Sequence, residues 1–185
     1  KDLNQKVLNK IIRPTLKGLK DLDTTFKGFL YAGLMIIKGE PYLIEYNVRM
    51  GDPECQTILP KLKTDFAEVI EACVSKNLEK IDLQWYKHKT LCIVLCSKGY
   101  PDDYQKNIEI NNLKKINLND NEFIFHAGTL EKDKKIFSNG GRALNFVIKS
   151  KDFKSCRERA ISLINQVDWK DGFYRKDIGF KVIDK

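Results

Sequence analysis

The stretch Tyr42-Leu-Ile-Glu-Tyr-Asn-Val-Arg-Met-Gly-Asp-Pro-Glu-Cys-Gln56 contains most of the side chains in this sequence that could carry chemistry. Its first part, Tyr42 to Arg49, is predicted to be a β-strand, because apolar and polar residues alternate along it. Alternation would place four side chains on one face of the strand: Leu43, Glu45, Asn47 and Arg49. Same-face neighbours lie about 6.5–7 Å apart, so a cation with attached phosphates could touch Glu45 and Asn47 at once.

A sharp turn and a short helix are expected directly after this strand. Gly51 allows an unusual backbone conformation, and Pro53 is favoured as the first residue of a helix. Asp52 would then be the N-cap, and the free N–H groups of the first turn would offer a seat for a carboxylate or phosphate. The alternatives are an N-cap without a ligand role and a polar strand face that simply meets water.

An amphipathic helix and a hairpin are expected before this stretch. Apolar residues recur with helical spacing from Asp2 to Leu19, and Pro14 should kink or restart that helix. Phe29 to Ile37 is apolar throughout, which favours a central strand covered on both faces. The turn Lys38-Gly-Glu-Pro41 would return the chain into the polar strand. Because the partner strand would be covered on both faces, we expect the polar face of this second strand to line a cleft.

A boundary is expected near residues 82–89. Before it, Thr64 can cap a helix whose apolar stripe contains Phe66, Val69, Ile70 and Cys73. After it, the sequence predicts five strands and a helix from Phe153 to Trp169, which together make a small α+β unit. The predicted strands are Leu91–Cys96, Ile108–Ile110, Phe123–Phe125, Lys135–Phe137 and Ala143–Ile148.

Two further segments could contact a ligand. Asn139-Gly-Gly is typical of a hairpin turn between two strands, and alternatively it presents Arg142 to a ligand. The segment from Phe173 to Gly179 carries two cations beside aromatic residues, and alternatively it only docks the C-terminus.

The charge of the chain does not favour nucleic-acid binding, although the net charge is +8. Of the 33 basic residues 27 are lysines, scattered along the chain and without interleaved aromatic residues that could stack on bases. A non-catalytic basic binding module stays open as an alternative. No apolar run approaches the ~20 residues of a membrane helix, and the five cysteines show no disulfide-type spacing. We therefore expect a cytoplasmic protein with no membrane partner.

Several of these segments, in this order, resemble the phosphoribosylamine–glycine ligase (glycinamide ribonucleotide synthetase) family of ATP-grasp enzymes. The resemblance runs through Ile11–Thr15, Gly28–Leu34, Leu43–Gln56, Gly99–Pro101, His126–Thr129, Asn139–Arg142 and Phe173–Gly179. Three residues depart from the family pattern, which has Phe at Tyr46 and more often Phe and Thr at Met50 and Cys55. None of these departures removes a ligand.

The resemblance implies an α+β fold made of the C-terminal half of an ATP-grasp domain and a small mixed α+β C-terminal domain. Residues 1–82 would form the nucleotide- and metal-binding half, and residues 83–185 the C-terminal domain. The chain would then be the C-terminal part of the enzyme. We expect it to need the remainder of the ligase, which bears the ATP clamp, and to be inactive alone.

The resemblance also implies an activity and roles for particular residues. In this family ATP phosphorylates the carboxylate of glycine, and the amine of 5-phosphoribosylamine attacks the glycyl phosphate in de novo purine biosynthesis. Glu45 and Asn47 match the ligands of Mg²⁺ (or Mn²⁺). We assign Arg49 a catalytic role on phosphoryl or carboxylate oxygens, and Asp52 and Arg142 substrate-binding roles. Another ATP-grasp carboxylate–amine ligase is the alternative within enzymes.

Overall fold

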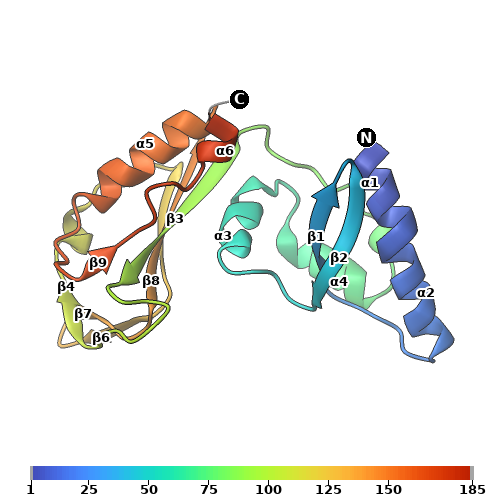
Figure 1. The fold of residues 1–185 in the computed structure, drawn as a ribbon, viewed down its shortest axis with the longest axis horizontal. Helices are drawn as coiled ribbons and strands as arrows, with labels where there is room; N and C mark the ends of the chain where they lie inside the picture. Colours follow the sequence, from blue (N-terminus) through green and yellow to red (C-terminus); the bar gives the residue numbers. More distant parts are fainter. Residues whose placement is uncertain (1, 184–185) are drawn as a thin grey trace. The chain divides into compact units, whose positions relative to one another are not determined.

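The protein consists of two compact units in the computed structural model, which describes residues 2–183 (Figure 1). The first unit contains residues 2–52 and 64–83, and the second contains residues 53–63 and 84–183. Residues 53–63 pack with the second unit because Leu62 forms a β-bridge with Trp85, and because the Lys63 amide donates to the Gln84 carbonyl at 2.8 Å. The assignment of residues 1–82 and 83–185 to two enzyme domains stays a prediction.

The first unit begins with a helix that contains one wider, π-helical turn just before a proline. Helix α1 (Asp2–Val7) continues through the π-helical turn η1 (Leu8–Ile12) into α2 (Arg13–Asp21). Pro14 has no amide hydrogen, and its ring would collide with the carbonyl four residues earlier in an α-helix. In the widened turn the Arg13 amide donates to the Leu8 carbonyl, five residues back. The predicted helix is confirmed, with a π turn at the expected irregularity.

The predicted hairpin is also confirmed. Strands β1 (Tyr31–Ile37) and β2 (Glu40–Asn47) pair antiparallel. Between them Lys38 and Gly39 have φ values of 50° and 77°, as in the two-residue turns that suit the twist of a hairpin. Strand β2 ends at Asn47, two residues earlier than predicted.

Strand β1 is not the central covered strand that the sequence suggested. Among the described residues it pairs only with β2, and Met35 and Ile37 are each 52% exposed. The prediction of a covered strand failed because the apolar run continues to the turn end of the hairpin, where its side chains are exposed within the unit. That prediction is wrong for this chain.

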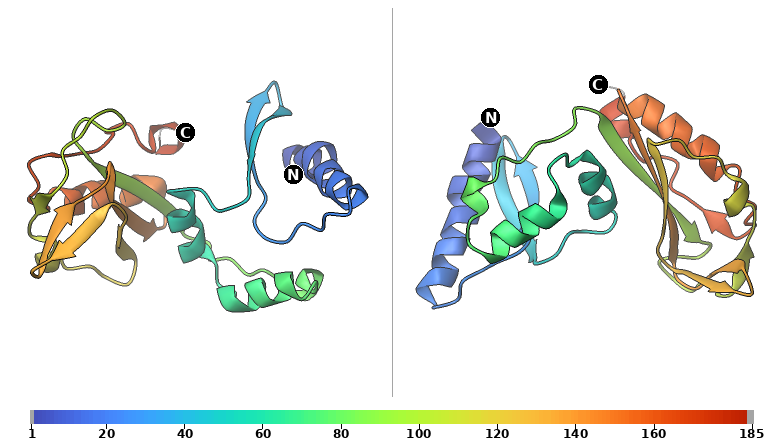
Figure 2. Two further views of the ribbon diagram at one scale, coloured as in Figure 1. Left: turned by 90° about the horizontal axis from the view of Figure 1, so that it is seen from below. Right: turned by 180° about the vertical axis from the view of Figure 1, so that it is seen from behind.

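The helix α1–α2 lies alongside the hairpin in all three views (Figures 1 and 2). Lys6 and Lys10 each donate to the Glu40 carboxylate at 2.6 Å, which ties the helix to the start of β2. The hydrogen bonds from Lys10 and Lys6 lower the pKa of Glu40 to about 2.

Helix α4 (Phe66–Val74) and the 3-10 turn η3 (Leu78–Lys80) complete the first unit. Asp65, not the predicted Thr64, caps α4, because its side chain accepts from the Ala67 amide at 2.7 Å. The apolar stripe of α4 faces Phe29 across a cavity of about 330 Å³.

The second unit is built on two antiparallel sheets. The larger has the strand order β5-β8-β3-β9, and the smaller has the order β4-β7-β6. The strands are β3 (Lys89–Ser97), β4 (Ile108–Ile110), β5 (Glu122–His126), β6 (Thr129–Lys132), β7 (Lys135–Ser138), β8 (Arg142–Ser150) and β9 (Gly172–Phe173). The helical elements are α3 (Glu54–Ile58), η2 (Leu59–Lys61), η4 (Leu113–Lys115), α5 (Phe153–Ile164) and α6 (Phe180–Ile183). The five predicted strands are confirmed, whereas β6 and β9 were not expected.

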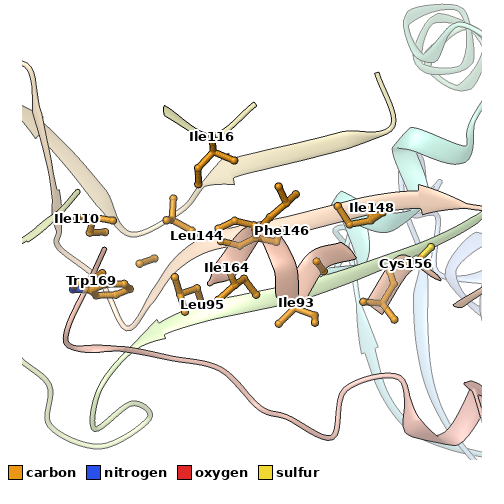
Figure 3. Close-up of a cluster of buried hydrophobic side chains, with 14 residues drawn as sticks. Ile93, Leu95, Ile110, Ile116, Leu144, Phe146, Ile148, Cys156, Ile164 and Trp169 are labelled. Atoms are coloured by element: carbon orange, nitrogen blue, oxygen red, sulfur yellow. The ribbon is translucent and has the colours of Figure 1, made fainter. Parts of the chain in front are cut away.

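Helix α5 covers the larger sheet and closes the main core (Figure 3). Phe146 and Leu144 of β8 and Ile93 of β3 are almost fully buried against Cys156 and Leu163 of α5. The helix ends at Ile164, earlier than predicted, and Trp169 joins the core from the loop that follows. By contrast, among the described residues Ile11 and Ala72 are the only apolar side chains of the first unit that are buried.

The segment Asn139-Gly-Gly is not the hairpin turn that the sequence suggested. It joins β7 to β8, but these strands belong to different sheets. The glycines are needed for close packing instead, since a Cβ on Gly128 would lie 2.6 Å from the Gly140 Cα, and a Cβ on Gly141 would lie 2.0 Å from the Tyr100 ring. The α+β class is confirmed, and no helix in residues 2–183 is long and apolar enough to cross a membrane.

Candidate functional site

Glu45 and Asn47 lie together on one face of the β1–β2 hairpin. In the ladder Glu45 is opposite Gly33, and Asn47 is opposite Tyr31. Paired residues share a face, so these four residues lie on the same side of the sheet. The Asn47 amide Nδ2 donates to Glu45 Oε1 at 3.2 Å, and Glu45 is exposed. The sequence prediction that the carboxylate and the amide lie on one face of the strand is confirmed.

A β-bulge beside Glu45 breaks the predicted alternation. The register shifts between Gly33 and Leu34, so that Leu43 is opposite Leu34 and Ile44 has no ladder partner. Leu43 therefore does not share the face of Glu45, contrary to the prediction. Bulges re-aim side chains and often occur beside active sites. On the other face, Tyr46 forms a hydrogen bond from its hydroxyl to Thr15 of α2.

The donor atoms of Glu45 and Asn47 suit a hard cation. Mg²⁺ prefers oxygen ligands, and proteins commonly supply one or two of them while phosphates and water supply the rest. Asn47 presents its nitrogen to Glu45 here, and a rotation of the amide group brings Oδ1 to the same place. Within residues 2–183 there is no group of three or more His, Cys, Asp and Glu residues that could hold a metal ion. The pair thus fits an ion shared with phosphate oxygens.

Arg49 does not continue the line of Glu45 and Asn47. It follows the end of β2, in a bend, and its Nη1 donates to the Met50 carbonyl at 3.2 Å. The predicted row of carboxylate, amide and guanidinium on one strand is therefore wrong, because the strand ends before Arg49. The guanidinium is exposed beside the turn that follows the strand.

Asp52 is not the N-cap of the following helix. Helix α3 begins at Glu54, and Pro53 occupies the N-cap position without a side-chain hydrogen bond. The prediction failed because Pro53 stands one position earlier than the first helical residue. Asp52 is exposed in the turn, and α3 is a five-residue helix of the second unit.

Arg142 begins β8 in the second unit, where it pairs with Cys96. Its side chain is exposed, and its carbonyl accepts from the Gly128 amide at 2.8 Å. Burial raises the pKa of the Cys96 thiol, while the Arg142 cation opposes that shift. Three segments singled out in the sequence, Gly99–Pro101, His126–Thr129 and Asn139–Arg142, meet here through the glycine contacts described above.

The segment from Phe173 to Gly179 is held by an arginine that the sequence patterns did not reveal. Arg157 of α5 donates to the carbonyls of Ile178, at 3.0 Å, and Lys176. Arg175 forms two hydrogen bonds with Asp177, at 3.1 and 2.7 Å, which raise the pKa of Arg175. Arg157 is one basic residue among many on a surface helix, so only the fold identifies it.

Gly33 is the second residue that sequence reasoning missed. It lies directly opposite Glu45, and a Cβ at this position would be 3.0 Å from Glu45 Cγ. The available signal was a glycine inside an apolar strand, which often marks a bulge or a close approach.

Comparisons with known proteins match an N-terminal and a C-terminal segment of this chain to two domains of the same class of enzyme. Residues 1–55 match the family model described as phosphoribosylglycinamide synthetase, ATP-grasp (A) domain. Residues 90–181 match the model described as phosphoribosylglycinamide synthetase, C domain. The polar hairpin therefore belongs to an ATP-grasp domain, and the class is that of the ATP-grasp ligases.

Individual relatives narrow this class. The chain is 41% identical over 181 residues to phosphoribosylamine–glycine ligase of Fusobacterium nucleatum, covering 97% of this chain and 42% of the relative. It is 41% identical to the chloroplastic enzyme of Arabidopsis thaliana, covering 99% of this chain and 35% of the relative. The crystal structure of the Thermotoga maritima enzyme matches with a TM-score of 0.80 and 32% identity, over 96% of this chain and 43% of that one.

The chain belongs to the phosphoribosylglycinamide synthetase family. It spans about 42% of the length of the first bacterial relatives that it matches.

Proposed function

We propose that this chain is part of an ATP-dependent ligase that joins glycine to 5-phosphoribosylamine in de novo purine biosynthesis. The observation that carries the proposal is the Glu45–Asn47 pair, 3.2 Å apart on a strand that lies within the matched ATP-grasp segment. The named relatives, which match over nearly the whole chain, support the choice of glycine and phosphoribosylamine as substrates.

The proposed reaction has two steps. A carboxylate oxygen of glycine attacks the γ-phosphorus of ATP, and ADP leaves, which gives glycyl phosphate. The amine nitrogen of 5-phosphoribosylamine then attacks the acyl carbon, phosphate leaves and the nitrogen loses a proton. Such transfers depend mainly on positioning and on charge stabilisation.

Glu45 and Asn47 would hold Mg²⁺, or Mn²⁺ in its place, against the phosphates of ATP. When bound, the ion neutralises charge on the transferring phosphoryl group. The contribution of the chain is the orientation of two oxygen donors on a strand that is fixed at one end by Lys6 and Lys10, through Glu40, and at the other by Thr15, through Tyr46.

Three further residues have proposed roles outside the strand. Arg49 is exposed beside the turn and would contact phosphoryl or carboxylate oxygens, for which a planar guanidinium is well suited. Asp52 would seat the ammonium group of glycine or stabilise the turn. Arg142, exposed at the start of β8, would contact substrate from the second unit.

The remainder of the ligase is the proposed protein partner. The hairpin exposes several large apolar side chains, which support a covering surface in the full-length protein. They are Met35, Ile36, Ile37, Leu43 and Ile44.

Product analysis of the full-length protein tests the proposed function. With ATP, glycine and 5-phosphoribosylamine, we expect glycinamide ribonucleotide, ADP and phosphate in equal amounts, detected by mass spectrometry and a phosphate assay. Failure to form this product, with turnover of a different acid or amine, would assign the chain to another ATP-grasp ligase.

A further inference from the structure

We propose that Gly33 is a positioning residue that lets the Glu45 carboxylate lie across strand β1 toward Asn47. This inference rests on the proposed metal-binding role of Glu45. Gly33 has no side chain of its own, and the evidence for its role is the space that it leaves for the side chain of Glu45.

The contacts at Gly33 are close. A Cβ added there would lie 3.0 Å from Glu45 Cγ and 3.7 Å from Glu45 Oε1. Carbon atoms in van der Waals contact normally lie about 3.5–4.0 Å apart, so the Glu45 side chain occupies space that any other residue would fill. Oε1 is also the oxygen that accepts from Asn47 Nδ2 at 3.2 Å. The carboxylate thus lies between Gly33 and Asn47.

The backbone does not require glycine at this position. Among the residues that the structure describes, four glycines have φ in the left-handed region, namely Gly28, Gly39, Gly99 and Gly179, and Gly33 is not one of them. Alanine therefore fits the backbone of β1 without strain. What alanine cannot keep is the position of Glu45 Cγ.

The bulge lies directly beside this contact. The register shift adjoins Gly33, and it places Leu43 and Glu45 on opposite faces of the hairpin. A methyl group at residue 33 would push Cγ outward by a few tenths of an ångström, which is comparable to the error of about 0.5 Å that a metal site tolerates. Gly33→Ala should therefore misplace one oxygen ligand while the hairpin itself stays folded.

The test measures Mn²⁺ binding to the full-length protein in the presence of a non-hydrolysable ATP analogue, by electron paramagnetic resonance of free Mn²⁺. We expect Gly33→Ala to weaken Mn²⁺ binding about tenfold, as loss of a group that supports a metal ligand commonly does, with an unchanged thermal midpoint. Gly18→Ala is the matched control, because a Cβ on Gly18 of α2 meets nothing within 4 Å. That control should bind Mn²⁺ as the wild type does.

A double-mutant comparison separates positioning from a general effect on the fold. If Gly33 acts through Glu45, adding Gly33→Ala to Glu45→Ala should cause no further loss of Mn²⁺ affinity. An equal loss in both backgrounds would overturn the inference. Wild-type affinity in Gly33→Ala, with weakened binding in Glu45→Ala, would overturn it too but leave the metal role intact. Unchanged affinity in Glu45→Ala would overturn the metal role and this inference together.

Discussion

The Asn47 side chain donates a hydrogen bond to the Glu45 carboxylate, at 3.2 Å between Nδ2 and Oε1. This bond lies on the face of the hairpin where Glu45 is opposite Gly33 of β1. Replacing Asn47 by aspartate turns this attraction into repulsion between two carboxylates, unless a cation lies between them. We expect Asn47→Asp to lower the thermal midpoint of the full-length protein without metal, and Mg²⁺ with the ATP analogue to restore it. A midpoint that does not respond to Mg²⁺ would argue against a cation at this pair.

The ion pair between Glu122 and Arg159 should stabilise the second unit. The Glu122 side chain is only 4% exposed, and Arg159 donates to its two oxygens at 2.7 and 2.9 Å. Arg159→Ala would leave a buried carboxylate with fewer partners, at a cost of roughly 2 kcal/mol in the free energy of unfolding. Chemical denaturation of the chain, followed by the fluorescence of buried Trp169, measures this cost.

The matched control is Arg175→Ala, which removes an equally well-formed but exposed pair with Asp177. Its effect should stay within about 0.5 kcal/mol. Equal effects of the two substitutions would show that burial of Glu122 does not matter.

The same pair predicts a pH dependence. The hydrogen bonds from Arg159 are the main cause of a pKa of Glu122 below its ordinary value of 4.5. Because the folded-state pKa is the lower one, the stabilisation is full above pH 4.5 and is lost as the pH falls through the folded-state value. The difference in unfolding free energy between wild type and Arg159→Ala should therefore shrink below pH 4.5. A difference that stays constant down to acid unfolding would contradict this.

Gly141→Ala tests the packing of the converging loops. The added Cβ would lie 2.0 Å from the Tyr100 ring, so either the ring or the loop must move. We expect a loss of about 2 kcal/mol in unfolding free energy, as in other overpacked sites. Gly18→Ala should instead be neutral or stabilising by up to about 1 kcal/mol, since it replaces glycine within a helix. Similar stabilities for the two variants would refute the packing argument.

Sequence patterns were sufficient to predict the helices, turns and strands that depend on residues close together in the sequence. The helix around Pro14, the Lys38-Gly39 turn and strand β3 each follow from spacing or from turn residues. Strands β6 and β9 were missed because Thr129–Lys132 is mostly polar and Gly172–Phe173 is very short, so neither carries an apolar alternation. Their existence depends on pairing with distant strands.

The same distinction applies to the candidate site. Alternation brought Glu45 and Asn47 together, but it also placed Leu43 and Arg49 with them. The residue types mark the bulge only through Gly33 on the partner strand, and they do not mark the early end of β2. The Asn139-Gly-Gly segment has the composition of a hairpin turn, and only the pairing of β7 and β8 in different sheets shows that it crosses between them. Gly33 gains its importance solely from what lies opposite it.

The 185-residue chain is expected not to catalyse the ligation when assayed alone. It spans about 42% of the length of its bacterial relatives, and its candidate metal site offers two ligands from one strand. An assay for ADP release with ATP, glycine and 5-phosphoribosylamine checks this expectation, with the full-length protein as the positive control. Turnover by the isolated chain that depends on glycine would show that no further residues are needed.

The most direct test of the metal role is the ligase turnover of Glu45→Ala in the full-length protein at saturating Mg²⁺ and ATP. We predict a loss of at least about a hundredfold, since a metal ligand is removed, with circular dichroism and thermal midpoint unchanged because Glu45 is exposed. Glu131→Ala, an exposed glutamate of strand β6, is the matched control and should keep wild-type turnover. Wild-type turnover in Glu45→Ala would contradict the assignment of Glu45 as a metal ligand.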